Sequence, residues 1–275
     1  PNVGNVQKQK WGQKMTTIEL IANFSYIVSA ALFIFGLKML GSPATARKGN
    51  FFSSIGMLIA VIAGLTAHQI ASFEMIVVGI LIGSIVGALA ARLVEMTSMP
   101  EMVALFNGSG GGASLLVGWA TLYNAEVSTF TAVTVILAIL IGGLTLTGSL
   151  LAYGKLSERI SSAAIVFSGQ RIVNSLILIG LIGSGVMLAN DPSPDSVWFY
   201  AVLGLSLLLG VMAVIPIGGA DMPVVISLLN SYSGIAACAA GFAINNNILI
   251  VAGSLVGASG IILTNIMCKA MNRSL

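Results

Sequence analysis

Nine long runs of apolar residues constrain the fold of this 275-residue sequence more than any other feature. A membrane-spanning helix needs about 20 mostly apolar residues. Hydropathy places such runs at 17–39, 51–69, 73–94, 100–122, 128–153, 171–189, 196–217, 222–243 and 247–269. The segments between them are short and leave no room for an inserted soluble domain. The sequence therefore predicts an all-α, polytopic membrane bundle of nine transmembrane helices.

Charged residues are too scarce to cover a water-facing surface. Only 8% of the residues are charged, whereas a soluble domain has about 25%. The net charge of +3 is small and the basic residues form no patch, which excludes a nucleic-acid binder. Two cysteines and one histidine are too few for a disulfide framework or a zinc site built within the chain.

The basic residues predict how the chain is oriented, because an odd number of spans puts the termini on opposite sides. Only Lys8, Lys10 and Lys14 fall on the N-terminal side. The nine on the other side are Lys38, Arg47, Lys48, Arg92, Lys155, Arg159, Arg171, Lys269 and Arg273. The positive-inside bias then places the C-terminus in the cytoplasm and the N-terminus outside. Since Met15 resembles a natural start, we expect residues 1–14 to be an upstream extension or a cloning remnant.

Two segments repeat at an offset of 123 residues without gaps: SMPEMVALFNGSGG at 98–111 and DMPVVISLLNSYSG at 221–234. The same offset maps the third span onto the seventh. The sequence therefore predicts a parallel repeat of spans 3–4 and 7–8 about an axis along the membrane normal. Ser98 and Asp221 each suit the N-cap of their copy, with a proline two residues later in the first helical turn.

Asn107 and Asn230 occupy equivalent positions in the two copies, nine residues after the cap. At 1.5 Å per residue, each lies about 13 Å along its helix. An amide at that depth is costly in hydrocarbon unless it faces a partner or water. Two interpretations fit: an interhelical hydrogen bond that fastens the bundle, and the lining of a water-filled path.

Other polar residues extend this candidate path. Thr145, Ser149 and Ser254 lie at similar depth, although such hydroxyls often bond back to their own helix. His68 ends the second span on the outer side and is either an interfacial histidine or a proton entry point.

Gly253, Gly257 and Gly260 recur in the last span at spacings of four and three residues. Small residues at this spacing place their Cα atoms on one side of a helix, where a neighbouring helix can approach closely. We expect them to form a helix-packing face.

Two functional classes remain after these observations. All nine acidic residues lie at or near helix ends, which weakens a carboxylate-based pump. No nucleophile–base pair or metal cluster is visible. One class is a proton- or small-ion-conducting membrane subunit, which would need partner domains. The other is a secondary transporter of a small solute or ion, which would work alone.

Several long motifs resemble the membrane domain of the β subunit of proton-translocating NAD(P)+ transhydrogenase. They are MPEMVALFNGSGGGASLLVGW (99–119), LTGSLLAYGKL (146–156), IGGADMPVVISLLNSYSG (217–234), NNNILIVAGSLVGASGIIL (245–263) and MCKAMNRSL (267–275). The resemblance covers nearly all of residues 15–275, which we therefore expect to be a transmembrane proton-conducting domain.

The resemblance implies an enzyme that couples hydride transfer between NAD(H) and NADP(H) to proton movement across the bacterial plasma membrane or the mitochondrial inner membrane. Of these two membranes, we expect the bacterial one. NAD(H) would bind a soluble domain of an α subunit, which also brings further membrane helices. NADP(H) would bind a soluble domain that continues the β chain after MCKAMNRSL, so we expect no cofactor on this chain. The complex resembles a homodimer of such assemblies.

The resemblance also assigns roles to individual residues. Asn230 and Ser149 match polar residues of the proton path, and Asp221 matches a loop carboxylate near the NADP(H) domain. Arg273 lies in the hinge that leads to that domain. Many members carry a histidine where this sequence has Asn107. Because asparagine cannot ionise, we expect a histidine on a partner helix instead.

We therefore expect Asn107, Asn230, Ser149 and Thr145 to line a gated, water-filled proton path. A second hypothesis concerns the cytoplasmic side, where a docking surface for the NADP(H) domain would comprise Asp221, Lys155, Arg159 and Arg273.

Overall fold

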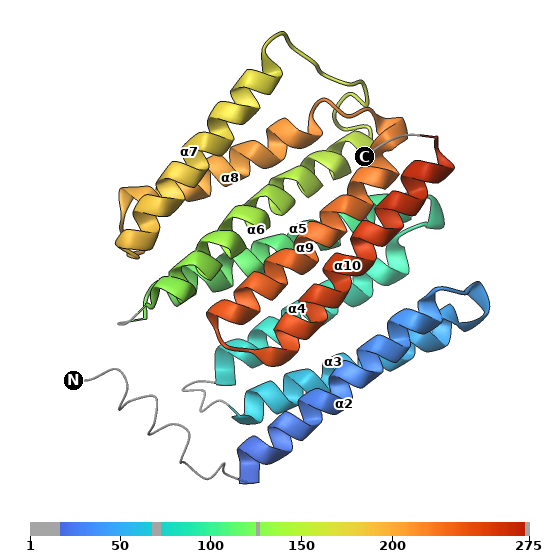
Figure 1. The fold of residues 1–275 in the computed structure, drawn as a ribbon. Coiled ribbons are helices and arrows are strands. Elements are labelled where there is room, and N and C mark those ends of the chain that lie inside the picture. The colour runs from blue at the N-terminus through green and yellow to red at the C-terminus, as the bar shows by residue number, and fades with distance from the viewer. Residues whose placement is uncertain (1–16, 68–72, 125–126, 273–275) are drawn as a thin grey trace. The chain divides into compact units, whose positions relative to one another are not determined.

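A computed structural model describes residues 17–67, 73–124 and 127–272, which are helical almost throughout (Figure 1). These residues form nine α-helices and two 3₁₀ turns. In chain order they are α2 (Thr17–Leu40), α3 (Pro43–Ala67), α4 (Phe73–Leu93), η1 (Met96–Ser98), α5 (Met99–Thr121), α6 (Thr129–Leu156), α7 (Gln170–Asn190), α8 (Val197–Val214), η2 (Gly219–Asp221), α9 (Met222–Ala243) and α10 (Asn247–Ala270). The predicted all-α class is confirmed.

Each predicted span coincides with one helix, and the ends differ where hydropathy is a poor guide. Helix α3 begins at Pro43, eight residues before the predicted 51, because its first turns are polar but helical. Proline suits that first turn since its missing N–H has no partner there. Helix α8 ends at Val214 rather than 217, because Pro216 has no backbone N–H with which to continue the helical hydrogen bonds.

Eight of these helices are long and apolar enough to cross a membrane, and the chain is a multi-pass membrane protein. Helix α5 is long enough, with 23 residues, but it carries the run GSGGGAS at 108–114 and falls short in hydropathy. Glycine and serine replace the large apolar residues that a lipid-facing helix would show. Helix α5 therefore has a composition suited to contact with other helices.

The chain divides into two compact units, residues 1–84 and 85–275. In the first unit, α2 and α3 form an antiparallel pair joined by a tight turn at Gly41 and Ser42. Ser29 Oγ donates a hydrogen bond to Gly56 O at 2.6 Å across the pair. The helices approach closely at Gly36 and Gly49, where a Cβ on Gly49 would lie 2.7 Å from Gly36 O.

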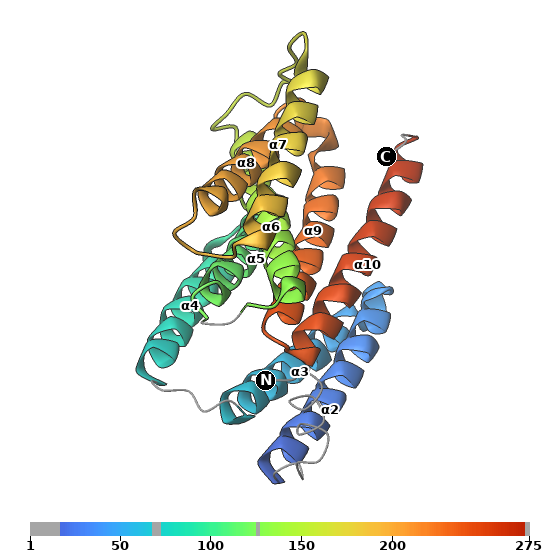
Figure 2. The same ribbon diagram turned by 60° about the vertical axis from the view of Figure 1, so that its left-hand side comes forward.

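The second unit is built around α6, which packs against α5, α7, α8 and α9. Helix α9 in turn packs against α5, α6 and α10, and α6 and α9 lie side by side in Figures 1 and 2. Three clusters of buried apolar residues fill the spaces between these helices. The largest side chains of one cluster are Phe199, Ile139 and Leu188, all fully buried.

Helices α5 and α9 run parallel, and α6 and α10 run antiparallel to them. One end of this unit therefore collects the start of α5, the end of α6, the start of α9 and the end of α10. The described basic residues of the unit all lie at this end: Arg92, Lys155, Arg159, Arg171 and Lys269. We call it the basic end. The loop segments at the other end, 122–124, 127–128, 191–196 and 244–246, carry no lysine or arginine.

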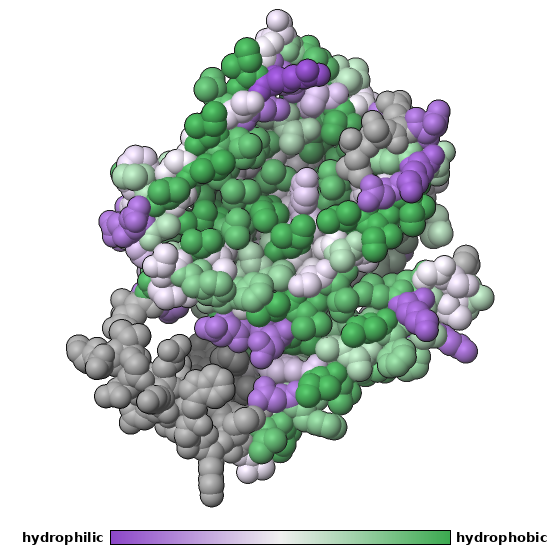
Figure 3. Space-filling model, in the orientation of Figure 1, coloured by the Kyte–Doolittle hydropathy of each residue, from purple (hydrophilic) through white to green (hydrophobic). Residues whose placement is uncertain are grey.

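The flanks of the helices are apolar where they face outward. On α7, Leu176, Ile179 and Ile182 are each more than half exposed. The face shown in Figure 3 is green along the helices, and purple residues gather near helix ends. Exposed apolar area on this scale would be unstable in water, and it matches the hydrocarbon of a bilayer.

The turn between α9 and α10 contains Asn245 and Asn246, and Asn247 begins α10. Asn245 has a φ of 54°, a left-handed conformation that asparagine tolerates better than most residues. Asn246 N donates to Gly241 O at 2.8 Å, which closes the end of α9. Asn246 Oδ1 accepts from Leu249 N at 3.1 Å, which caps the start of α10. This turn fixes α9 and α10 as an antiparallel pair.

The α9–α10 contact predicts that Gly253→Ala destabilises the protein. A Cβ on Gly253 would lie 2.5 Å from Cys238 N, a backbone atom that cannot move without its helix. Overpacking of this kind costs about 1–3 kcal/mol, so the midpoint of thermal unfolding in detergent should fall. Gly183→Ala on α7 is the matched control, since nothing lies within 4 Å of its added Cβ. Equal midpoints for the two variants would contradict the close contact.

Candidate functional site

Polar side chains in the second unit gather along the contacts of α9 with α5, α6 and α10. Helix α5 can come close to α6 because glycines face each other. A Cβ on Gly142 would lie 2.5 Å from Gly111 O. Short polar side chains on either helix can therefore reach the neighbouring backbone.

Asn107 is buried and joins α5 to α9. Its Nδ2 donates a hydrogen bond to Ile226 O at 3.1 Å. In an α-helix the carbonyl of residue 226 also accepts from the N–H of residue 230. The Asn107 amide is thus attached to the turn of α9 from which Asn230 projects. The two asparagines of the sequence repeat lie at the same level on neighbouring parallel helices.

Asn230 differs from Asn107 in its surroundings. It is half-buried, and its side chain makes no hydrogen bond to the described residues. Its amide can therefore bind water or a partner group at the level of the Asn107 contact.

Thr145 and Ser149 lie one turn apart on α6, and both are fully buried. Thr145 Oγ1 donates to Ile141 O at 2.6 Å in its own helix. Ser149 lies beside Gly108, where an added Cβ would be 3.1 Å from Ser149 Cβ. Its Oγ has no hydrogen-bond partner within the described part of the chain. A buried hydroxyl without a partner costs about 1–3 kcal/mol, so Ser149 is an unusual position in this core.

Helix α9 is joined to α10 by hydroxyl groups that the sequence interpretation missed. Ser231 Oγ donates to Gly257 O at 2.6 Å, and Thr264 Oγ1 donates to Ser227 Oγ at 3.0 Å. Ser227 and Ser231 are four residues apart and so share one face of α9. Two serines four residues apart on α9, together with the small residues of α10, were the sequence signal from which this contact could have been predicted.

The three glycines expected to form a packing face lie buried against α9. A Cβ on Gly260 would lie 2.8 Å from Ser231 Cα, and one on Gly257 would lie 3.0 Å from Ile235 Cγ1. Gly253 makes the closest backbone contact, as described above.

Ser254, a further residue of the candidate path, does not join this group. Ser254 is exposed on α10, and its Oγ donates to Ile250 O at 2.7 Å and lies 3.2 Å from Cys238 Sγ. It does not face α5 or α6. His68 lies outside the described residues.

Lys155 is placed differently from the exposed docking position expected for it. Only 1% of its surface is exposed, because its Nζ turns into the loops of the basic end. There it donates to Ala163 O at 3.2 Å, Ile215 O at 2.6 Å and Ile217 O at 2.7 Å. A partner domain therefore cannot contact this ammonium group without opening the loops.

The other expected docking residues lie nearer the surface or outside the described residues. Asp221 is half-buried and occupies the N-cap position of α9. Arg159 is exposed, with its Cζ 5.4 Å from the centre of the Tyr153 ring, a cation–π distance. Arg273 lies outside the described residues.

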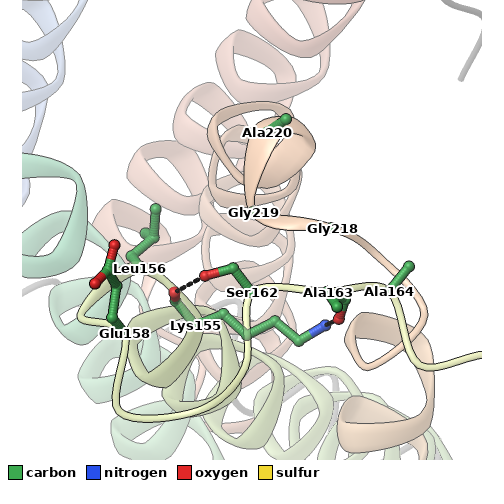
Figure 4. Close-up of a pocket in the computed structure, with 9 residues that line it drawn as sticks. All are labelled: Lys155, Leu156, Glu158, Ser162, Ala163, Ala164, Gly218, Gly219 and Ala220. Atoms are coloured by element: carbon green, nitrogen blue, oxygen red, sulfur yellow. Dashed lines mark hydrogen bonds between the residues drawn. The ribbon is translucent and has the colours of Figure 1, made fainter.

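An open hollow of about 600 Å³ lies between the loops at the basic end (Figure 4). Its lining comprises Lys155, Leu156, Glu158, Ser162, Ala163, Ala164, Gly218, Gly219 and Ala220. The residues of the 218–220 segment lead directly into α9. In the described ranges, no group of His, Cys, Asp and Glu side chains could hold a metal ion.

The sequence is similar to known proteins over most of its length. Residues 22–275 match the family described as NAD(P) transhydrogenase beta subunit. Two curated relatives, both named NAD(P) transhydrogenase subunit beta and both from Rhodospirillum rubrum, are 40% identical over 260 residues. The alignment covers 91% of this chain and 56% of each relative, so this chain spans about half the length of the relatives it matches.

The unpaired hydroxyl of Ser149 predicts opposite effects for two serine-to-alanine variants. Ser149→Ala removes a group that bonds to nothing in the described chain, so the unfolding midpoint in detergent should stay the same or rise. Ser231→Ala removes an interhelical bond of a kind that contributes about 0.6–1.7 kcal/mol in membrane proteins, so the midpoint should fall. A loss for Ser149→Ala as large as that for Ser231→Ala would mean that Ser149 Oγ has a partner.

Proposed function

Because the chain belongs to the NAD(P) transhydrogenase beta subunit family, we propose that it is the domain that moves protons in such an enzyme. In the assembled enzyme, hydride transfer between NAD(H) and NADP(H) on soluble domains would be coupled to proton movement through this domain. We further propose that residues 15–275 are this domain and that an α subunit is its partner. A soluble NADP(H) domain in the rest of the β chain and a homodimeric assembly belong to the same proposal.

The observation that carries this proposal is the polar group at the α5–α6–α9 contact. Asn107, Ser149 and Thr145 are buried there. Asn230 is half-buried, one turn of α9 beyond the Ile226 carbonyl that Asn107 contacts. Neither the side-chain amide of Asn230 nor the hydroxyl of Ser149 makes a hydrogen bond to the described residues. Groups of this kind can hold a short chain of water molecules, since each water needs two to four polar partners.

The same group cannot hold the proton itself. Asparagine, serine and threonine do not ionise near neutral pH, and the described acidic residues lie at or near helix ends. We propose that Asn107 and Asn230 orient water, while a titratable group on a partner helix takes up and releases the proton. Helix α5, with its low hydropathy, is the helix best suited to contact such a partner.

A secondary transporter of a small solute or ion is not favoured, because the matched family describes a different activity. The transporter interpretation requires substrate uptake by this domain alone in liposomes. Proton coupling instead requires the assembled enzyme and its nucleotides.

The orientation remains part of the proposal. The described basic residues of the second unit gather at one end, and the positive-inside bias would place that end in the cytoplasm. The NADP(H) domain would then lie beside the hollow and the start of α9.

Cysteine labelling tests this orientation. Ser161 and Asp195 are both exposed, at the basic end and at the opposite end respectively. A membrane-impermeant maleimide added to intact cells should label Asp195→Cys and leave Ser161→Cys unlabelled. The reverse result would place the basic end outside.

The proton path predicts that Asn230→Leu impairs coupling in the assembled enzyme. The leucine removes the free amide and fills its space with hydrocarbon. Proton translocation should fall about tenfold, which corresponds to about 1.4 kcal/mol on the barrier. Dye quenching in inverted vesicles measures the translocation, and immunoblotting checks that the subunits are present in equal amounts.

Ser109→Ala is the matched control for Asn230→Leu. Ser109 is exposed on α5, and its Oγ bonds back to Leu105 O at 2.9 Å. This variant should translocate protons as the unaltered enzyme does. Full coupling in Asn230→Leu would show that Asn230 does not line the path.

A further inference from the structure

The buried ammonium group of Lys155 joins two loops that are far apart in the sequence. One loop, residues 157–169, follows α6, and the other, residues 215–221, precedes α9. Lysine has three N–H donors. All three are used, one on Ala163 O of the first loop and two on Ile215 O and Ile217 O of the second. We call Lys155 and these three carbonyl groups the Lys155 clamp.

Few other polar contacts connect the same loops. Gly219 N donates to Ser162 O at 2.8 Å, and Ile165 N donates to Ile215 O at 3.2 Å. Ser162 Oγ also donates to Lys155 O at 3.0 Å, and this bond attaches the first loop to the end of α6 (Figure 4). These bonds are between neutral groups. The bonds of the ammonium are charge-assisted and therefore stronger.

The burial of Lys155 is informative because a lysine at a helix end has an easier alternative. Its long side chain can extend and leave the charge in water. Burying a charge is costly unless hydrogen bonds satisfy it. Here every donor has a carbonyl partner, so the loop conformation and the charge stabilise each other. Without the ammonium, Ala163 O and Ile217 O lose the partner that it gives them.

The clamp also connects two of the three helices of the polar group, α6 and α9. Lys155 lies six residues after Ser149 on α6, about 9 Å along the helix axis. Ile217 lies five residues before Met222, where α9 begins, and α9 carries Asn230 and the Ile226 carbonyl that Asn107 contacts. A displacement of either loop is therefore transmitted to α6 and α9 together.

We propose that Lys155 is a positioning residue that makes the end of α6 and the start of α9 move as one unit, so that the loops set the position of Ser149 relative to Asn230. This inference rests on the proposed function, because it concerns the coupling of loop movements to the proton path. Lys155 touches neither nucleotide nor proton. It acts through the two loops.

The first test replaces Lys155 in the full-length enzyme with all its subunits, reconstituted in vesicles. Lys155→Met keeps the length of the side chain and removes the charge and the donors. The readout is the number of protons moved per hydride transferred. A merely structural role would lower the amount of assembled enzyme and leave this ratio unchanged. The ratio should fall at least about fivefold, the low end of coupling between sites; an unchanged ratio would overturn the proposal.

The second test asks whether a covalent link can replace the clamp. A Cβ on Gly219 would lie 3.1 Å from Ser162 Cβ, a few tenths of an ångström short of the usual range of about 3.5–4.5 Å in disulfides. In Lys155→Met/Ser162→Cys/Gly219→Cys, a mild oxidant should restore the ratio and a reductant should lower it again. Ser162→Cys alone, oxidised in the same way, controls for the native cysteines. Failure of the formed disulfide to restore the ratio would overturn the proposal.

A third test does not require Lys155→Met to assemble. In Ser162→Cys/Gly219→Cys with Lys155 present, the clamp already holds the loops together, so oxidation should leave the ratio unchanged. A fall in the ratio that a reductant reverses would show that the loops separate during turnover and would overturn the proposal.

The unaltered enzyme in the same vesicles separates this proposal from the proposed function. If it moves no protons during hydride transfer, the proposed function fails. If it moves protons and the three tests give the contrary results, only the role of Lys155 fails.

Discussion

Polar side chains of this protein bond mainly to backbone carbonyl groups, and the arrangement of its helices depends on this. The hydrocarbon of a bilayer offers no water as a hydrogen-bond partner, and the described carboxylates of this protein lie at or near helix ends. Asn107 therefore uses a carbonyl of α9, Ser231 uses one of α10, and Ser29 uses one of α3. Lys155 is the extreme case, because three carbonyl groups bind a full charge. Apart from the bond of Lys155 to Ala163 O, each of these bonds joins segments that are distant in the sequence.

Glycine makes such bonds possible, since a serine side chain is too short to reach across an ordinary helix contact. Ser231 reaches Gly257 O where glycines of α10 allow its backbone to touch α9. Ser29 reaches Gly56 O in the same way in the first unit. Small residues and hydroxyl donors therefore act together: the small residues let the helices approach, and the hydroxyl groups then form interhelical hydrogen bonds. In this way α9 is held against α10. Away from that contact, the side chains of Asn230 and Ser149 make no hydrogen bond to the described residues.

Much of the fold could be predicted from hydropathy, because every apolar run is long enough to define its helix. The start of α3 at Pro43 could not, since its first turns resemble a loop in composition. The repeat placed Asn107 and Asn230 at one level, and the Asn107–Ile226 bond is consistent with that level. Whether the repeat reflects a structural symmetry stays a prediction.

The polar contacts of the site were less predictable. Lys155 illustrates the reason, because its burial depends on two loops whose acceptors lie eight residues and about 60 residues away. A lysine at the end of an apolar run ordinarily points to water, and nothing local to the sequence indicates otherwise. The hydroxyl groups of Ser227, Ser231 and Thr264 were missed for a related reason. Because a hydroxyl in a helix can always bond to its own backbone, only the position of the partner helix shows which hydroxyls bond across the contact.

The low hydropathy of α5 has a consequence for biogenesis. A translocon releases a segment into lipid according to its apolarity, and the glycine- and serine-rich stretch of α5 makes that partition unfavourable for the helix alone. Helix α6 follows directly, is strongly apolar, and presents Gly142 to the glycines of α5. Helix α5 should therefore leave the translocon as a hairpin with α6. The contact that positions Asn107 and Ser149 would then form during synthesis, before α9 and α10 are made.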